Sequence, residues 1–294
     1  ATMRVNHYTD IDDYAARALP FLLAREAEHC LAIGLIITLQ RGESAYPAPP
    51  YLALVEDDAG AVIAAPLATP PHNLILSHLA PSAEVEVDEA LRLIAADAHD
   101  AMPGLPGVQG PDGLVDRFVE QWERLTGQSG RVFMRECLFR LEHVRPIPSV
   151  SGAIRRIEEA DRPLLREWGR AFSAEALGIT DDPEIEPLIA QSLRFGSSGM
   201  YLWQDGASVV SLAGYRGPTP HGIRVGPVYT PPEARGHGYA SALVAALSQR
   251  LLDEGRQFTF LFTNLANPTS NHIYQQVGYD PVSDITVYTF EQAR

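Results

Sequence analysis

The feature that most constrains the fold of this 294-residue chain is an internal repeat. One copy begins at Tyr51 and reads YLALVEDDAGAVIAAPLATPPHNLILSHLAP, and the other begins at Tyr201 and reads YLWQDGASVVSLAGYRGPTPHGIRVGPVYTPP. Both copies predict a strand, an Asp/Gly turn, a second strand, a Pro-His pair and a third strand. The spacing of about 150 residues is one domain length, so the chain is predicted to contain two copies of one domain.

The segments around each copy extend the repeat. A strand and a helical stretch precede each copy, and two helical stretches and a late strand follow it. The late strands read RVFMRECLFRLEHV and PVSDITVYTFEQA, and HVRPIPSVSG between the halves has the composition of a linker. The sequence thus predicts two mixed α/β domains, residues 1–145 and 153–294, joined by a linker at residues 146–152. Two unrelated α/β domains are the alternative, which the matched Tyr-Leu and Pro-His positions disfavour.

The charge balance limits the class of partner. The formal net charge is −14, from 37 acidic and 23 basic residues, and every basic residue is arginine. A general nucleic-acid-binding protein has the opposite balance, so no nucleic-acid partner is expected. A negative field favours a cationic small molecule or a peptide amine as ligand.

Cysteine usage and hydropathy favour a cytoplasmic protein without a metal. Cys30 and Cys137 form no Cys-x-x-Cys spacing, so neither a disulfide framework nor a zinc site is predicted. The longest apolar run, CLAIGLIITL, is shorter than the ~20 residues of a membrane helix and predicts a buried helix. The first residues, ATMRVNHYTD, have none of the regions of a signal peptide. We expect no membrane partner.

One junction in the second half predicts a phosphate site. The strand IRVGPVYT is followed by the loop PPEARGHG and by a helix from about Tyr239 to Glu254. The first N–H groups of a helix have no intrahelical acceptor and attract anions. Gly236 and Gly238 remove side chains that would keep an anion away, and Arg235 adds a positive charge. A diphosphate is the expected ligand.

This junction resembles the acyl-CoA loop of the GNAT superfamily of N-acetyltransferases, whose pattern is Arg/Gln-x-x-Gly-x-Gly/Ala. Arg235, Gly238 and Ala240 fill the pattern. A second match is NPTSNHIYQQVGYDPV, which is similar to a later helix of the family that an Asn opens, a Tyr follows and Gly-Tyr closes. The local chemistry agrees, because Asn267 suits an N-cap and Gly278 suits a C-terminal cap. The resemblance covers residues 151–294 and, through the repeat, residues 1–145.

The resemblance implies an α/β (α+β) fold of two tandem GNAT-like domains, each with a mixed, mostly antiparallel sheet flanked by helices. It implies an acetyl-CoA-dependent N-acetyltransferase that acts on a small-molecule or peptide amine, with acetyl-CoA as co-substrate and no metal. The residues assigned to acetyl-CoA are Val228, Tyr229, Thr230, Arg235, Gly236, His237, Gly238, Tyr239, Ala240, Asn267, Asn271 and Tyr274.

The resemblance also implies catalytic roles for two residues. The Val228 N–H would polarise the thioester carbonyl, and Tyr274 would protonate the departing thiolate. Two simpler interpretations stay open: Gly226-Pro227 as a plain edge-strand bulge, and Tyr274 as a buried structural tyrosine. The general base is not assigned, and a water chain is an alternative to any side chain. The candidates are Glu175, Asp181, Asp182, Glu184, Glu186 and His221.

The first half is expected to have the same fold as the second half but not to bind acetyl-CoA. The segment APSAEVEVDEALRL, from Ala80 to Leu93, aligns with the phosphate loop, has no glycine and carries four carboxylates before its first arginine. We expect one acetyl-CoA per chain, and a monomer or a homodimer. A rival function is a non-catalytic acyl-CoA sensor or interaction module. A transferase that uses aminoacyl-tRNA ranks last, because it would need a basic surface.

Overall fold

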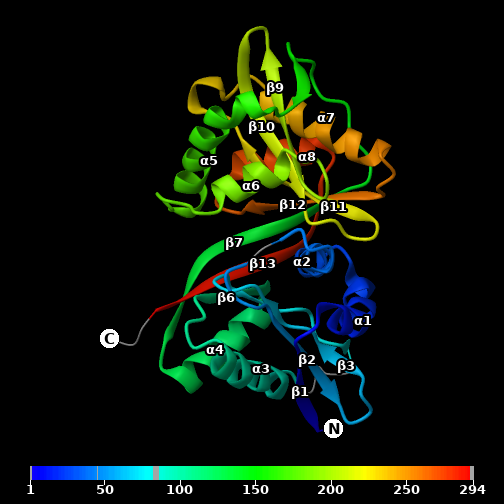
Figure 1. The fold of residues 1–294 in the computed structure, drawn as a ribbon, viewed down its shortest axis with the longest axis vertical. Coiled ribbons are helices and arrows are strands. Elements are labelled where there is room, and N and C mark those ends of the chain that lie inside the picture. Colours follow the sequence, from blue (N-terminus) through cyan, green and yellow to red (C-terminus); the bar gives the residue numbers. More distant parts are fainter. Residues whose placement is uncertain (1, 45, 82–85, 292–294) are drawn as a thin grey trace. The chain divides into compact units, whose positions relative to one another are not determined.

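The computed structural model describes residues 2–44, 46–81 and 86–291 and divides the chain into two compact units (Figure 1). Unit 1 consists of Ala1–Leu138, Thr263–Ala266 and Val282–Arg294. Unit 2 consists of Phe139–Phe262 and Asn267–Pro281. In each unit a mixed, mostly antiparallel sheet is flanked by helices, which confirms the predicted fold class.

Unit 1 begins with a strand and two helices and continues into the first copy of the repeat. Its elements are β1 (Met3–Tyr8), α1 (Ile11–Leu22), η1 (Leu23–Arg25), α2 (Cys30–Gln40), β2 (Tyr51–Asp57), β3 (Val62–Ala64), β4 (Leu67–Ala68), β5 (Leu74–Ile75), α3 (Val87–Ala101), β6 (Gly107–Pro111), α4 (Leu114–Thr126) and β7 (Ser129–Leu141). The strand β2 is buried on both faces. Ala53 and Val55 contact the core under α3 and α4, while Leu52 and Leu54 contact the core under α1 and α2.

The last strand of the chain, β13 (Asp280–Glu291), completes the sheet of unit 1. It pairs antiparallel with β6, from Ile285 opposite Pro111 to Thr289 opposite Gly107. The Phe290 ring stacks on Trp122 at 4.6 Å between centroids. The predicted domain division groups this strand with the second domain, whereas its described residues from Val282 onward belong to unit 1. The alternation of apolar residues in a strand does not specify which sheet edge it joins.

Unit 2 contains the second copy of the repeat. Its elements are β8 (Ala153–Arg156), η3 (Glu159–Asp161), α5 (Arg162–Leu177), α6 (Ile185–Ser192), β9 (Gly199–Asp205), β10 (Ser208–Arg216), β11 (Gly222–Tyr229), η4 (Pro232–Ala234), α7 (Tyr239–Asp253), β12 (Phe258–Asn264) and α8 (Pro268–Val277). The strand order is β12-β11-β10-β9-β8, with β11 and β12 parallel. The helices α5 and α6 pack on one face of this sheet, and α7 lies along β9, β10 and β11 (Figure 1).

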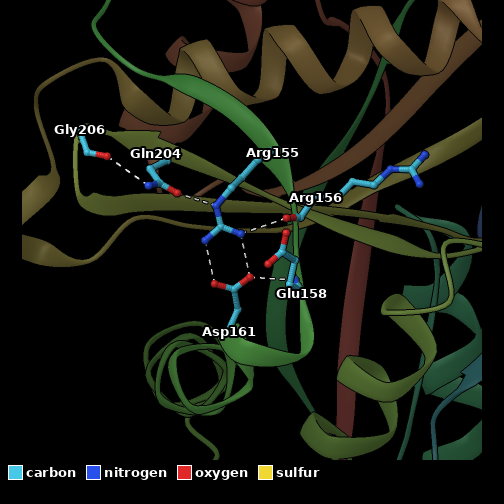
Figure 2. Close-up of polar contacts among 6 residues, drawn as sticks. All are labelled: Arg155, Arg156, Glu158, Asp161, Gln204 and Gly206. Carbon is cyan, nitrogen blue, oxygen red and sulfur yellow. Dashed lines mark hydrogen bonds and ion pairs between the residues drawn. The ribbon is translucent and has the colours of Figure 1, made fainter.

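A polar cluster fixes the first strand of unit 2 to the start of α5. Figure 2 shows the Arg155 guanidinium in a two-bond contact with the Asp161 carboxylate, with both N···O distances at 2.8 Å. The Arg155 Nε donates to Gln204 Oε1 at 2.6 Å, and Asp161 also accepts from the Glu158 N–H at 2.8 Å. The hydrogen bonds from Arg155 are the main reason that the pKa of Asp161 lies below its ordinary value.

This cluster predicts an acid-sensitive contribution to the stability of unit 2. A carboxyl whose folded pKa is lowered stabilises the fold above its unfolded pKa, and this contribution is lost as the pH falls through the folded pKa. We expect Asp161→Asn to lower the free energy of unfolding by about 1–2 kcal/mol at pH 7 and to flatten its dependence on pH below about 4. Urea titrations between pH 2 and pH 7 measure this. Asp280→Asn, which breaks an exposed ion pair with Arg145, is the control and should change little. Parallel pH profiles for Asp161→Asn and the wild type would contradict the prediction.

Candidate active site

The site lies where two parallel strands of unit 2 stop pairing. The registered pairs of β11 with β12 run from Gly222 opposite Phe258 to Arg224 opposite Phe260, and none beyond these joins the two strands among the described residues. Both strands continue, β11 to Tyr229 and β12 to Asn264. Among the described residues, the second half of β11 therefore has no registered partner in β12, and its backbone groups on that side are not part of a ladder with β12.

The other edge of β11 contains the predicted bulge. Ala213 of β10 is opposite Val228, but Tyr215 is opposite Val225, so β11 has one extra residue in this interval. Gly226 and Pro227 occupy the interval, and Gly226 has a φ of +147°. An extra residue bends a strand and increases its twist. The bulge thus lies where β11 leaves β12.

The loop after β11 brings a helix N-terminus to the open end of the strand. Gly236 and Gly238 both have positive φ, +80° and +82°, which is the conformation that favours glycine. The loop from Arg235 to Gly238 is exposed, and α7 begins at Tyr239 as predicted. Gly238 is the N-cap residue and has no side chain to accept from the first N–H groups of the helix. These groups can therefore bind an anion.

Arg235 lies at the edge of this loop but is bound to two oxygen atoms. Its Nε donates to the Thr230 carbonyl at 2.8 Å, and its Nη2 donates to Glu175 at 2.8 Å. The guanidinium carbon lies 5.9 Å from the centroid of the Tyr229 ring. The positive charge expected at the phosphate site is therefore shared with a carboxylate of α5.

Two aromatic side chains, His237 of the loop and Tyr239 at the start of α7, contact each other and nearby polar groups. The rings of His237 and Tyr239 stack at 5.7 Å, and His237 Nδ1 lies 3.2 Å from the Ala234 carbonyl oxygen. The Tyr239 hydroxyl donates to Asp205 at 2.7 Å, and the Ser151 hydroxyl donates to the same carboxylate at 2.8 Å. The hydrogen bond from Tyr239 is the largest cause, and the one from Ser151 the second, that lowers the pKa of Asp205 below its ordinary value. Tyr239 and the half-buried Ala240 are the first two residues of α7, so their backbone N–H groups have no acceptor within the helix and can bind an anion.

The helix α8 has the predicted ends. The Asn267 side chain caps it by accepting from the Ser270 N–H at 3.2 Å, and Pro268 is its first residue. The helix stops at Val277 because Gly278 has a φ of +122°. The half-buried Asn271 lies three residues before Tyr274 on this helix.

Two tyrosines near the end of α8 differ in their hydrogen bonds. The Tyr279 hydroxyl is fully buried and bonds to Ser248 at 2.8 Å and Thr259 at 2.9 Å, so it is part of the core. The Tyr274 ring contacts Tyr279 edge to face at 6.2 Å. Its hydroxyl has no hydrogen-bond partner within residues 2–44, 46–81 and 86–291, and burial raises its pKa. A neutral, unbonded hydroxyl is suited to donate a proton to a ligand.

The structure separates one candidate base from the open strand. His221 immediately precedes β11, while Val228 lies near the far end of that strand. Seven residues of extended strand span about 23 Å. The His221 backbone carbonyl instead accepts from Gln257 and Phe258, at the closed end of the parallel pair. His221 is not placed to take a proton from a nucleophile near Val228.

The acidic candidates differ in their partners. Asp182 accepts from the Ser173 hydroxyl at 2.7 Å, and Glu186 forms ion pairs with Arg162 and Arg166. Asp181 and Glu184 belong to the same exposed stretch before α6. Glu175 is the candidate that the structure joins to the loop, through its ion pair with Arg235.

Two neighbours of the loop were missed by the sequence reasoning. An ideal Cβ at Gly238 would lie 3.0 Å from a methyl carbon of Val150, so a segment interpreted as a spacer packs against the loop. Asp205, at the end of β9, holds the Tyr239 hydroxyl. Nothing in the sequence signals either contact, because both join residues that are more than 30 positions apart.

In unit 1 the backbone near the end of the repeat bonds to a buried histidine. The His78 N–H donates to Nε2 of the buried His29 at 3.0 Å. The other ring nitrogen of His29 lies 2.9 Å from the Leu22 carbonyl oxygen, and burial lowers its pKa to about 4. The imidazole is thus neutral and fully bonded. Residues 82–85, in the segment aligned with the phosphate loop, lie outside the described residues.

The described residues contain neither a candidate metal cluster nor a candidate membrane span. Across residues 2–44, 46–81 and 86–291, no three His, Cys, Asp or Glu side chains are grouped so as to hold a metal ion. None of the helices in those ranges has the length and apolar character needed to span a bilayer.

Comparison with solved structures defines the class of fold. A GNAT-family acetyltransferase from Colwellia psychrerythraea has 9% identity and a TM-score of 0.62, over 98% of this chain and 100% of its own. A tandem GNAT protein from the clavulanic acid biosynthesis pathway, solved without AcCoA, has 12% identity and a TM-score of 0.63, over 100% and 99%. A GCN5-related N-acetyltransferase from Sphaerobacter thermophilus has 15% identity and a TM-score of 0.65, over 99% and 96%. The chain has the tandem GNAT fold along its whole length.

The sequence itself matches one family model. Residues 207–287, which include β11, the loop, α7 and α8, match the model of FR47-like proteins. The resemblance to the GNAT superfamily predicted from the motifs is confirmed by this match and by the fold. A search of curated protein sequences found no match.

Proposed function

We propose that the chain is an acetyl-CoA-dependent N-acetyltransferase whose active site lies in unit 2. The observation that carries the proposal is the second half of β11, which has no registered partner in β12 among the described residues and leads directly into a glycine loop at the N-terminus of α7. An extended thioester arm fits the first feature, and a diphosphate fits the second. Gly236 supports the fit, because an ideal Cβ there would meet no atom within 4 Å among the described residues.

The proposed reaction is direct transfer. A neutral amine attacks the thioester carbonyl, the C–N bond forms, and the C–S bond then breaks. The Val228 N–H would stabilise the developing oxyanion, and Tyr274 would give its proton to the leaving sulfur. The amine's own proton passes to a base that we leave unassigned. Two features make Tyr274 the better proton donor of the two tyrosines: its hydroxyl is unbonded among the described residues, and that of Tyr279 is bonded twice.

The acceptor is proposed to be an amine of a small molecule or peptide, cationic before it loses its proton. The net charge of −14 and the acidic stretch between α5 and α6 support this choice. We further propose a cytoplasmic monomer or homodimer that binds no nucleic acid. Unit 1 is proposed to bind no acetyl-CoA.

Ligand-induced stabilisation tests the site. We expect acetyl-CoA to raise the melting temperature of the wild type and to bind once per chain in a calorimetric titration. Gly236→Asp should abolish both effects, because it adds a carboxylate where the diphosphate would lie. Gly206→Asp is the control: it is also a glycine with positive φ and open space, at the turn between β9 and β10.

The outcomes separate the proposal from its rivals. Full binding by Gly236→Asp, or two equivalent sites per chain, would show that the loop is not the single phosphate site. Binding by the wild type without release of free thiol across a panel of amines would instead identify an acyl-CoA sensor.

A further inference from the structure

The partner of Arg235 carries an inference that rests on the proposed function and goes beyond it. Arg235 belongs to the loop, Thr230 directly follows the last residue of β11, and Glu175 lies in the last turn of α5. One guanidinium thus connects three segments around the proposed ligand. The guanidinium also interacts with the Tyr229 hydroxyl, and both Arg235 and Glu175 are about half exposed, with side-chain exposures of 48% and 49%.

A diphosphate and Glu175 need the same cation. An arginine guanidinium can bind one carboxylate or one phosphate through two parallel hydrogen bonds. When both anions are near, each of them is neutralised less completely than it would be alone. Two anions that approach one another also repel. An exposed ion pair contributes little free energy, so a ligand with two or more negative charges can compete with it.

We propose that Arg235 exchanges partners when acetyl-CoA binds: its guanidinium turns from Glu175 to the diphosphate, while the bond to the Thr230 carbonyl keeps it in place. Glu175 is then a specificity-determining residue that opposes the binding of phosphate-bearing ligands. In the complex it becomes an unpaired carboxylate at the end of α5, beside the acidic stretch that leads to α6. The free carboxylate is suited to a cationic amine.

The first test is the affinity of Glu175→Gln for acetyl-CoA. Gln has nearly the same shape and can still accept a hydrogen bond, but it has no charge. We expect the dissociation constant to fall about two- to five-fold at low salt, which is the range of an exposed ion pair. The difference should shrink as salt screens the charges. A merely structural role for Glu175 would weaken binding or leave it unchanged.

Glu167→Gln is the matched control. Glu167 is exposed on the same helix and has no ion pair with any described residue, so its removal changes the net charge by the same amount. A second control is the double variant Arg235→Gln with Glu175→Gln. In the Arg235→Gln background the Glu175 substitution should lose its effect, because the two residues act through one contact.

The second test measures the release of Glu175 directly. Carbodiimide with glycinamide modifies accessible, unpaired carboxylates, and mass spectrometry gives the extent of modification at each residue. We expect saturating acetyl-CoA to increase the modification of Glu175 at least two-fold and to leave Glu167 unchanged.

The results distinguish this inference from the proposed function. If the wild type binds acetyl-CoA but Glu175→Gln binds it no more tightly, or Glu175 becomes no more reactive, the exchange of partners is wrong and the proposed function stands. If the wild type does not bind acetyl-CoA, both are wrong.

Discussion

Gly107→Ala is expected to lower the free energy of unfolding of unit 1 by about 3 kcal/mol or more. An ideal Cβ at Gly107 would lie 2.0 Å from the Tyr288 carbonyl oxygen and 2.9 Å from Asn73 Oδ1. The nearer atom is backbone, so it cannot rotate away as a side chain would. The β6–β13 pair must therefore separate, which also disturbs the stacking of Phe290 on Trp122. Urea unfolding followed by tryptophan emission measures the loss.

Gly104→Ala is the control for this prediction. Gly104 lies three residues earlier, and a Cβ there would meet no described atom within 4 Å. This substitution should leave the free energy of unfolding within about 0.5 kcal/mol of the wild type. If both variants unfold at the same urea concentration, β13 is not held against β6 in the way described.

Tyr274→Phe should keep the affinity for acetyl-CoA within a few-fold and lower kcat by about 10²–10⁴. The substitution preserves the ring and its edge-to-face contact with Tyr279 and removes the hydroxyl that would donate the proton. Because this hydroxyl has no hydrogen bond within the described residues, its loss should cost little stability. Initial rates of thiol release with a good amine acceptor measure kcat.

Tyr279→Phe provides the contrast. Its hydroxyl bonds to Ser248 and Thr259 in the core, so removal leaves two buried polar groups with a partner lost. We expect this variant to lose about 1–3 kcal/mol of stability and to retain its kcat while folded. An unchanged kcat in Tyr274→Phe would assign Tyr274 to packing and remove it from the mechanism.

The local features of unit 2 could be predicted from the sequence because short-range chemistry determines them. A glycine pair before a leucine stripe predicts a helix that begins at Tyr239, and Asn-Pro before another helix predicts its cap. The bulge at Gly226-Pro227 follows from the missing N–H of proline. The repeat predicts that the first strand of each copy begins at Tyr51 and at Tyr201. In the structure β2 begins at Tyr51, and β9 begins two residues before Tyr201, at Gly199.

The longer-range contacts could not be predicted in the same way. Glu175 and Arg235 are 60 residues apart, and many other carboxylates could have paired with that arginine. The sheet that β13 joins depends on the edge that is available to it, which its own residues do not encode. Both contacts are determined by the tertiary structure and not by the local sequence.

The place of β13 has a consequence for synthesis on the ribosome. The edge of β6 is made early, but its partner strand follows roughly 170 residues later. At about 5–20 residues per second, that edge waits roughly 10–35 seconds for its partner to be translated. An unpaired strand edge is a template for pairing with other chains. The β6–β13 pair of unit 1 therefore forms only after unit 2 has been translated, and the unpaired edge of β6 is available to other chains during that interval.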